Sequence, residues 1–185
     1  MKLTNGLDEK QILDQANKIS EINDKLKLMN QYTKRSKKNH HHHHILSGNF
    51  RILSSAEVNI MKDGSLDIAN NVLDKLDIVG AAIHSSFAQP IEVQTERLIK
   101  TAQNPSVDII FHPTGRRINK REGYAVNMEK LIEVAKDTDT VLEIDAHYDR
   151  LDLKDDYIRM AVENSIKLVI DSDAHLFSLK ELVLH

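Results

Sequence analysis

The sequence contains no cysteine among its 185 residues. This absence excludes disulfide bonds, zinc sites built from thiolates, and cysteine nucleophiles. No apolar run approaches the ~20 residues that a membrane-spanning helix needs, and the first ten residues, MKLTNGLDEK, lack the apolar core of a signal peptide. The net charge is only -3, so no strong overall field favours nucleic acid or a membrane surface. We therefore expect a cytoplasmic protein with a single domain over residues 1–185.

The N-terminal part of the chain has the pattern of one long helix followed by a loop. Apolar residues recur at steps of three or four between Leu7 and Met29, which predicts an amphipathic helix within residues 1–32. A basic stretch with five consecutive histidines, His40–His44, follows, and we interpret residues 33–45 as a loop. The histidine run is a natural metal-binding loop, an engineered tag or an insertion without function, and its composition leaves these alternatives open.

Strand and helix patterns alternate over the rest of the chain, residues 46–185. Five apolar runs rich in valine and isoleucine have the character of strands covered on both faces: 50–60, 76–84, 107–113, 140–147 and 167–175. Helical patterns begin near Ile91, after caps at Asn127 and Asp155, and again from Ser178. The last four strands begin roughly 30 residues apart, the length of a strand–helix unit. The pattern predicts an α/β fold with a parallel sheet or barrel and helices outside it.

Polar residues that bind metals or move protons stand at the ends of the predicted strands. They are His84, His112, Glu143, Asp145, His147, Asp171, Asp173 and His175, with Glu57 near the end of the first run. In a parallel barrel, the C-terminal ends of all strands open on one rim, where barrel enzymes keep their active sites. Each residue also has an ordinary interpretation, as a polar side chain at a loop mouth or, for Glu143, as a structural hydrogen-bond partner. Five such groups on one rim favour a functional site.

The types of side chain indicate the chemistry of that site. Imidazoles mixed with carboxylates, without thiolates, suit Zn, Mn or Fe. Two or more such ions close together bind a phosphate and generate hydroxide near neutral pH, so hydrolysis of a phosphoester is the reaction that this set serves best. Arg116 and Arg117 follow His112 closely and are candidates for binding phosphate oxygens, although solvated loop arginines explain them equally well.

Five segments of the chain carry a resemblance to a known family. They are EVNIMKDGSLD (57–67), AAIHSSF (81–87), TERLIKTAQNPSVDIIFHPTGR (95–116), LEIDAHYDRLDL (142–153) and DSDAH (171–175). In this order they resemble the PHP (polymerase and histidinol phosphatase) domain, in particular the version at the C-terminus of bacterial and archaeal family X DNA polymerases. The resemblance implies a distorted (βα)7 TIM-like barrel, a trinuclear metal centre and hydrolysis of phosphoesters. In family X polymerases the domain is associated with 3′–5′ exonuclease and DNA end-processing activity, which implies DNA 3′ ends as a substrate.

The resemblance also implies roles for individual residues. Glu57 matches a bridging carboxylate, and His84 and His112 would complete one metal position with it. Asp173 would serve a second ion and His175 a third. The resemblance therefore implies divalent ions as cofactors, with one well-supported position and up to three in the complete family.

The chain departs from the family pattern in several places. Asp145 and Asp171 stand where asparagine is usual, so we do not count them as ligands. The strand with a His-x-His pair and the later Thr-Asp-His-Ser segment do not occur. We therefore expect an incomplete barrel that lacks roughly the first two βα units, with reduced activity. Open sheet edges would favour a homodimer that covers them.

Two functional interpretations follow from these observations. The first is a metal-dependent phosphoesterase that acts on DNA 3′ ends or on a small phosphorylated substrate, and the retained ligands favour it. The second is a non-catalytic remnant that binds one metal ion and serves as an assembly or interaction module, and the missing His-x-His pair favours it. A sugar-phosphate phosphatase resembling the histidinol-phosphate branch is a third interpretation, which the HPTGR and DRLDL segments fit less well.

Overall fold

The computed structural model describes residues 6–36 and 50–173 of the chain. Two compact units divide the chain: residues 1–56 with 68–79, and residues 57–67 with 80–185. Among the helices in residues 6–36 and 50–173, none is a candidate for a membrane span. The predicted helix from Ser178, the His40–His44 run and the predicted ligand His175 lie outside the described residues.

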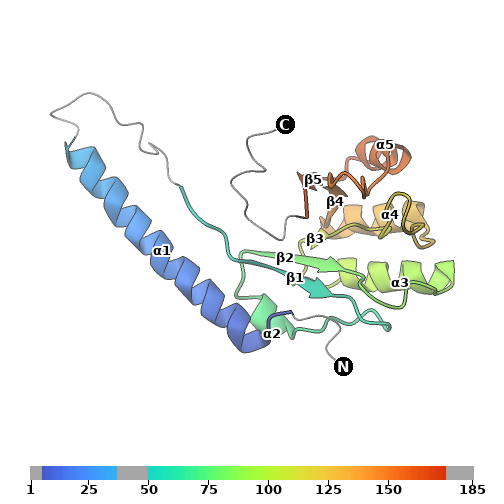
Figure 1. Ribbon diagram of the computed structural model, residues 1–185, viewed down its shortest axis with the longest axis horizontal. Helices are drawn as coiled ribbons and strands as arrows, with labels where there is room; N and C mark the ends of the chain where they lie inside the picture. Colours follow the sequence, from blue (N-terminus) through green and yellow to red (C-terminus); the bar gives the residue numbers. More distant parts are fainter. Residues whose placement is uncertain (1–5, 37–49, 174–185) are drawn as a thin grey trace. The chain divides into compact units, whose positions relative to one another are not determined.

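The first unit contains the long N-terminal helix that the apolar periodicity predicts. Helix α1 spans Glu9–Ser36, and so extends beyond residue 32 (Figure 1). A capping box fixes its start, because the Asp8 carboxylate accepts the Gln11 N–H and the Gln11 side chain accepts the Asp8 N–H, both at 2.8 Å. The same unit holds a short helix that the sequence pattern does not predict, α2 at Asn70–Leu73.

A parallel sheet of five strands forms the centre of the fold, with the strands in sequence order β1-β2-β3-β4-β5 (Figure 1). The strands are β1 Ser55–Asn59, β2 Ile78–Ala82, β3 Ile109–Ile110, β4 Val141–Asp145 and β5 Leu168–Asp171. Each lies inside one of the five predicted apolar runs and is shorter than that run. The prediction of an α/β fold with a parallel sheet is confirmed, and closure into an incomplete barrel stays a prediction.

Helices connect the later strands, as the pattern predicts. They are α3 Ile91–Ala102, α4 Met128–Thr138 and α5 Asp155–Glu163. The Asn127 side chain accepts the Lys130 N–H at 3.1 Å and caps α4 as predicted. The predicted cap of α5 is wrong by one position: Lys154 stands there without a side-chain cap bond, and Asp155 is the first helical residue. An acidic side chain in the first turn still stabilises the helix through its dipole.

Close packing between the helices and the sheet holds the strand ends in place. Helices α3 and α4 lie side by side in Figure 1, and Leu98 of α3 and Leu131 of α4 are fully buried, as is Leu142 of β4. Burial of each leucine stabilises the fold by about 1.5–3 kcal/mol. Gly80 of β2 faces the Phe111 ring so closely that a Cβ atom would overlap it. The residues that follow β2 and β3 are therefore fixed on a rigid support.

Candidate metal centre

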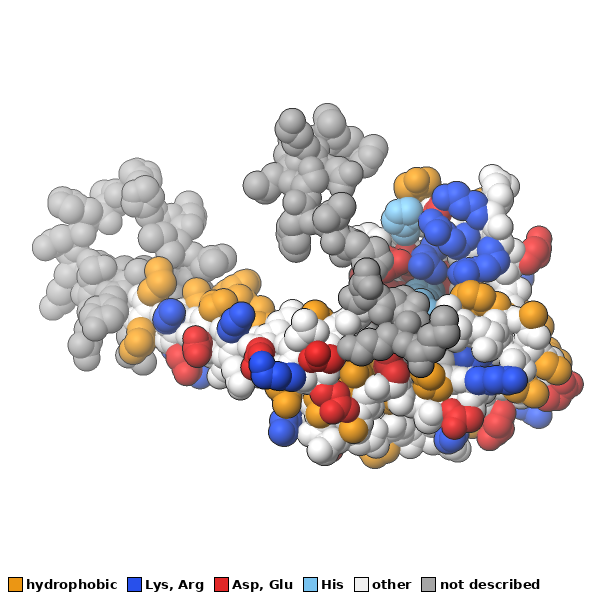
Figure 2. Space-filling model, turned by 60° about the horizontal axis from the view of Figure 1, so that its bottom comes forward, with side chains coloured by type: hydrophobic (Ala, Val, Ile, Leu, Met, Phe, Trp, Pro, Cys, Tyr) orange, Lys and Arg blue, Asp and Glu red, His pale blue; other side chains and the backbone are white. Residues whose placement is uncertain are grey.

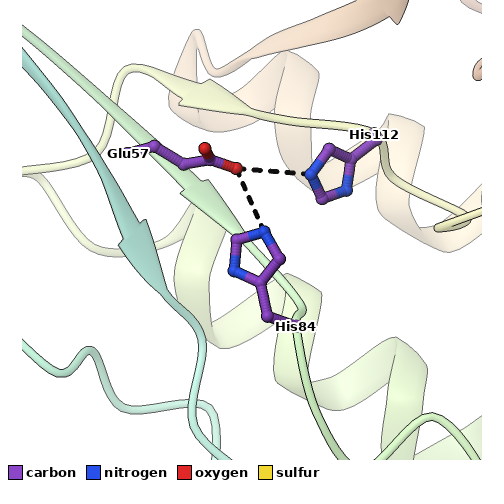
Figure 3. Close-up of side chains that lie close together, drawn as sticks. All are labelled: Glu57, His84 and His112. Atoms are coloured by element: carbon purple, nitrogen blue, oxygen red, sulfur yellow. Dashed lines mark hydrogen bonds and ion pairs between the residues drawn. The ribbon is translucent and has the colours of Figure 1, made fainter. Parts of the chain in front are cut away.

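Three of the predicted ligands meet at the C-terminal side of the sheet (Figure 3). Glu57 belongs to β1, His84 follows β2 and His112 follows β3. The Glu57 Oε1 atom lies 3.2 Å from His84 Nε2 and 3.3 Å from His112 Nε2. One ligand atom from each residue lies within 4.8 Å of the others. These contacts follow from the strand order, because neighbouring parallel strands end at the same edge.

The centre lies partly below the surface. The His112 side chain is 3% exposed, and those of His84 and Glu57 are each 29% exposed. Burial by itself would raise the pKa of Glu57, but hydrogen bonds with His112 and His84 outweigh it and hold the pKa well below its usual range. Glu57 is therefore a carboxylate at neutral pH, which is the charge state that a metal ligand requires.

A chain of hydrogen bonds orients the ring of His84. The Asn59 Nδ2 group donates to Asp67, so its Oδ1 atom faces His84 Nδ1 at 2.7 Å and accepts the proton there. This leaves Nε2, which faces Glu57, as the ring nitrogen that would bind a metal ion. Metal-binding histidines usually have such a partner on the other ring nitrogen, which fixes tautomer and orientation. The sequence analysis does not identify Asn59 as a site residue. Asn59 lies two positions after Glu57, so the two side chains share one face of β1, and this spacing is the signal that could have identified it.

The donor set fits a divalent metal ion. Two imidazole nitrogens, one carboxylate and an open position form the usual catalytic zinc arrangement. Ligands about 2.0–2.1 Å from a tetrahedral zinc lie about 3.3 Å apart, and Glu57 Oε1 lies 3.2 and 3.3 Å from the two histidine nitrogens. Among the described residues this is the one group of three His or acidic side chains close enough to share an ion.

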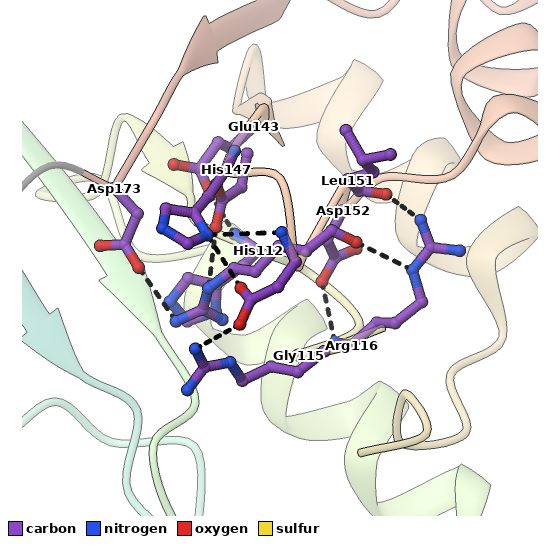
Figure 4. Close-up of polar contacts among 12 residues, drawn as sticks. His112, Gly115, Arg116, Glu143, His147, Leu151, Asp152 and Asp173 are labelled. Carbon is purple, nitrogen blue, oxygen red and sulfur yellow. Dashed lines mark hydrogen bonds and ion pairs between the residues drawn. The ribbon is translucent and has the colours of Figure 1, made fainter. Parts of the chain in front are cut away.

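Asp173 lies at the wall of the same cavity but has a different partner. Arg150 donates from Nη2 to Asp173 at 3.0 Å (Figure 4), and its Nε atom forms an ion pair with the fully buried Asp145 at 2.9 Å. The cavity has a volume of about 290 Å³, and Asp173 lines it together with Glu57 and His112. Asp173 thus lies at the cavity, and the guanidinium of Arg150 holds its carboxylate there. Its role as a ligand of a second ion stays a prediction.

The buried side chain of Glu143 contacts the backbone of His112. Its side chain is 2% exposed and accepts the backbone N–H of His112, as expected for the structural interpretation of this residue. Burial, together with a hydrogen bond to Asp171, raises the pKa of Glu143 to about 9. Glu143 therefore keeps its proton at neutral pH and is a neutral acid beside the predicted ligand His112.

The guanidinium of Arg116 contacts the backbone of a neighbouring loop. Its Nε atom donates to the carbonyl of Arg150 at 3.1 Å and its Nη2 atom to the carbonyl of Leu151, while its backbone N–H donates to Asp152 at 3.3 Å (Figure 4). These bonds hold loop 150–152 in position. Binding of phosphate by Arg116 stays a prediction. His147, another predicted polar strand end, pairs with Asp149 at 2.8 Å and not with the centre.

Known proteins are similar to this chain, although no family model matches it. The DNA polymerase/3′-5′ exonuclease PolX of Bacillus subtilis (strain 168) is 40% identical over 175 residues, which cover 95% of this chain and 27% of that protein. A probable phosphatase of Thermoanaerobacter sp. (strain X514) is 36% identical over 135 residues, 68% of this chain and 53% of that protein. A probable phosphatase of Clostridium novyi (strain NT) is 26% identical over 134 residues, which cover 68% of this chain and 52% of that protein. The chain thus spans about a quarter of the polymerase and about half of the phosphatases.

Proposed function

Because this chain carries a PHP-type domain similar to the relatives above, we propose that it is a metal-dependent phosphoesterase whose metal ligands are Glu57, His84 and His112. The observation that carries the proposal is the meeting of these three side chains, which come from β1 and from the segments that follow β2 and β3. Zinc, manganese and iron are the ions that suit a site of two imidazoles and one carboxylate.

The metal ion and the cavity would have different roles in the proposed hydrolysis. A divalent ion held there would lower the pKa of a bound water to about 7 and so supply hydroxide at neutral pH. The cavity of about 290 Å³ provides room for a phosphate group next to the ligands. Arg150 forms part of this environment through Asp173, and its Nη1 atom is buried without a hydrogen-bond partner among the described residues.

We further propose that the substrate is a phosphodiester at a DNA 3′ end. The support is the relative named for 3′-5′ exonuclease activity, which matches 95% of this chain, against 68% for the probable phosphatases of Thermoanaerobacter sp. and Clostridium novyi. A phosphomonoester is the alternative that those phosphatases suggest. Parallel assays with bis(p-nitrophenyl) phosphate and p-nitrophenyl phosphate distinguish the two, because only the first is a diester.

The test is hydrolysis of bis(p-nitrophenyl) phosphate by the full chain in the presence of Mn²⁺ or Zn²⁺. His112→Ala removes one ligand and should lower the rate at least about 100-fold, more than loss of an outer partner does. Both proteins should also carry asparagine in place of His40–His44, so that this run cannot supply metal. Activity that survives His112→Ala would show that the hydrolysis does not come from this centre.

A non-catalytic metal-binding module is a second candidate function. The observation that favours it is the pairing of Asp173 with Arg150, which leaves one group of three ligands among the described residues. This candidate predicts that one ion binds at the centre and that His112→Ala abolishes the binding. It also predicts that neither diester nor monoester is hydrolysed at any metal concentration.

A further inference from the structure

A basic surface lies beside the candidate metal centre on the segment after His112. Residues 116–123, here called the basic hairpin, carry four positive side chains and one acidic side chain, Glu122. The positive residues are Arg116, Arg117, Lys120 and Arg121. The hairpin lines a depression of about 490 Å³. Figure 2 shows Lys and Arg side chains gathered next to histidine on this face.

The basic hairpin has a defined shape. Arg117 and Arg121 pair as an antiparallel bridge, and Asn119 turns the chain with a positive φ of 59°. The backbone N–H of Ile118 donates to the carbonyl of Asp149 at 2.6 Å. The hairpin is therefore fastened to the loop that follows β4, which also carries Arg150.

One carboxylate orients the exposed cations of the hairpin. Asp149 accepts from Arg117 Nη2 at 2.6 Å and from Lys120 Nζ at 2.7 Å, and it also pairs with His147. The Asp149 side chain is 6% exposed, whereas those of Arg117 and Lys120 are 39% and 57% exposed. Two fixed cations thus share one buried negative charge, and a net positive charge faces solvent. The Arg117 Nε atom, buried, has no hydrogen-bond partner among the described residues.

An exposed aromatic ring lies in the loop that contains Asp149. Tyr148 is 81% exposed and follows His147, whose ring centroid lies 4.5 Å from that of Tyr148. An aromatic ring held at the surface beside ordered cations is the chemistry by which proteins bind single strands of nucleic acid, since bases stack on the ring and phosphates meet the cations. An acidic peptide would use the cations but would leave the ring without a role.

The same loop connects this surface to the metal centre. Arg150 lies two residues beyond Tyr148 and contacts Asp173, which lines the cavity with Glu57 and His112. Figure 4 shows the carboxylate of Asp173 joined to the neighbouring network of polar contacts. A polynucleotide strand whose last phosphate lies at the centre would therefore pass Arg150, and its next phosphates would reach the basic hairpin.

From this arrangement we propose that the basic hairpin and Tyr148 bind a single-stranded polynucleotide, with phosphates on Arg117 and Lys120 and a base stacked on Tyr148. The proposal rests on the proposed function in one respect, which is that the 3′-terminal phosphodiester of the strand lies at the metal centre. The surface then determines that the substrate is a polynucleotide and not a small phosphoester.

The test is fluorescence anisotropy of a 5′-labelled oligothymidylate of 12 nucleotides with the full chain in EDTA. Without metal, binding is measured apart from hydrolysis, so failure of the proposed function and failure of this proposal give different results. The variant Arg117→Ala/Lys120→Ala should bind more weakly. The slope of log K against log salt concentration should also fall by about 1.4, because each lost phosphate contact on a single strand contributes about 0.7.

The matched control removes two exposed lysines from α4, as Lys130→Ala/Lys136→Ala. This variant loses the same charge and should keep the salt slope of the unmodified chain. Tyr148→Ala should weaken binding about tenfold or more, whereas Tyr148→Phe, which keeps the stacking ring, should bind as well as tyrosine. Circular dichroism establishes that each variant is folded.

Two results would overturn the proposal. One is no binding of the oligonucleotide by the unmodified chain at low salt. The other is an equal loss of affinity and slope in the hairpin variant and the α4 control, because binding would then depend on overall charge and not on this surface.

Discussion

The buried acid Glu143 gives the protein a pH-dependent stability that one substitution should remove. Burial and the neighbouring Asp171 raise the pKa of Glu143 to about 9, from a usual value of 4.5 in the unfolded chain. Between these two values the folded protein holds a proton that the unfolded chain has released. Stability is therefore lost as the pH rises from about 4.5 towards about 9, and it is unaffected by this group below that range.

The size of the effect follows from the single proton involved. One proton gives a slope of about 1.4 kcal/mol per pH unit in the free energy of unfolding. Between about pH 5.5 and about pH 7.5 the unmodified protein should thus lose up to about 3 kcal/mol through this group. Glu143→Gln removes the titration but keeps an oxygen that accepts the His112 N–H and gains an amide that donates to Asp171.

Urea denaturation in EDTA at a series of pH values measures the effect. The difference in free energy of unfolding between the unmodified protein and Glu143→Gln should change steadily over this range, in favour of the glutamine variant at higher pH. Glu133→Gln removes an exposed carboxyl group from α4 and serves as the control, with a constant difference. A constant difference for Glu143→Gln as well would refute the reasoning, because the folded protein would then hold Glu143 as an ordinary carboxylate.

Two further substitutions test the contacts around the centre. Arg150→Leu leaves the fully buried Asp145 without its charged partner and should lower the free energy of unfolding by about 3–5 kcal/mol in urea; a loss below about 1 kcal/mol would show that the pair does not hold this loop. Asn59→Ala removes the acceptor that orients His84 and should weaken binding of Mn²⁺ about 10–100-fold by titration calorimetry, with the His40–His44 run replaced by asparagine. Unchanged affinity would mean that this ring needs no outer partner.

The meeting of the three proposed ligands could be predicted from the sequence. Glu57, His84 and His112 each stand near the end of an apolar run, and the runs follow one another at the spacing of strand–helix units. Parallel strands that are neighbours in sequence and in the sheet end at one edge, so these side chains had to converge. The regular spacing of the apolar runs therefore predicts both the parallel sheet and the edge at which the candidate metal centre lies.

The partners of the site residues could not be predicted in the same way. Arg150 pairs with Asp173, 23 positions away, and this ion pair depends on loop geometry that no periodicity encodes. Asn59 gains its role only when β1 and the end of β2 come together. The length of a strand is similarly decided by its neighbours: the apolar run 107–113 forms only two residues of strand in β3, because pairing depends on backbone partners and not on hydrophobicity.

The central claim is that Glu57, His84 and His112 share one divalent ion. Anomalous diffraction at the zinc or manganese edge, from crystals of the full chain grown with that metal, measures this directly. We predict an anomalous peak about 2.0–2.2 Å from Oε1 of Glu57 and from Nε2 of both histidines. Anomalous peaks at His40–His44 alone, with none between these three side chains, would contradict the claim.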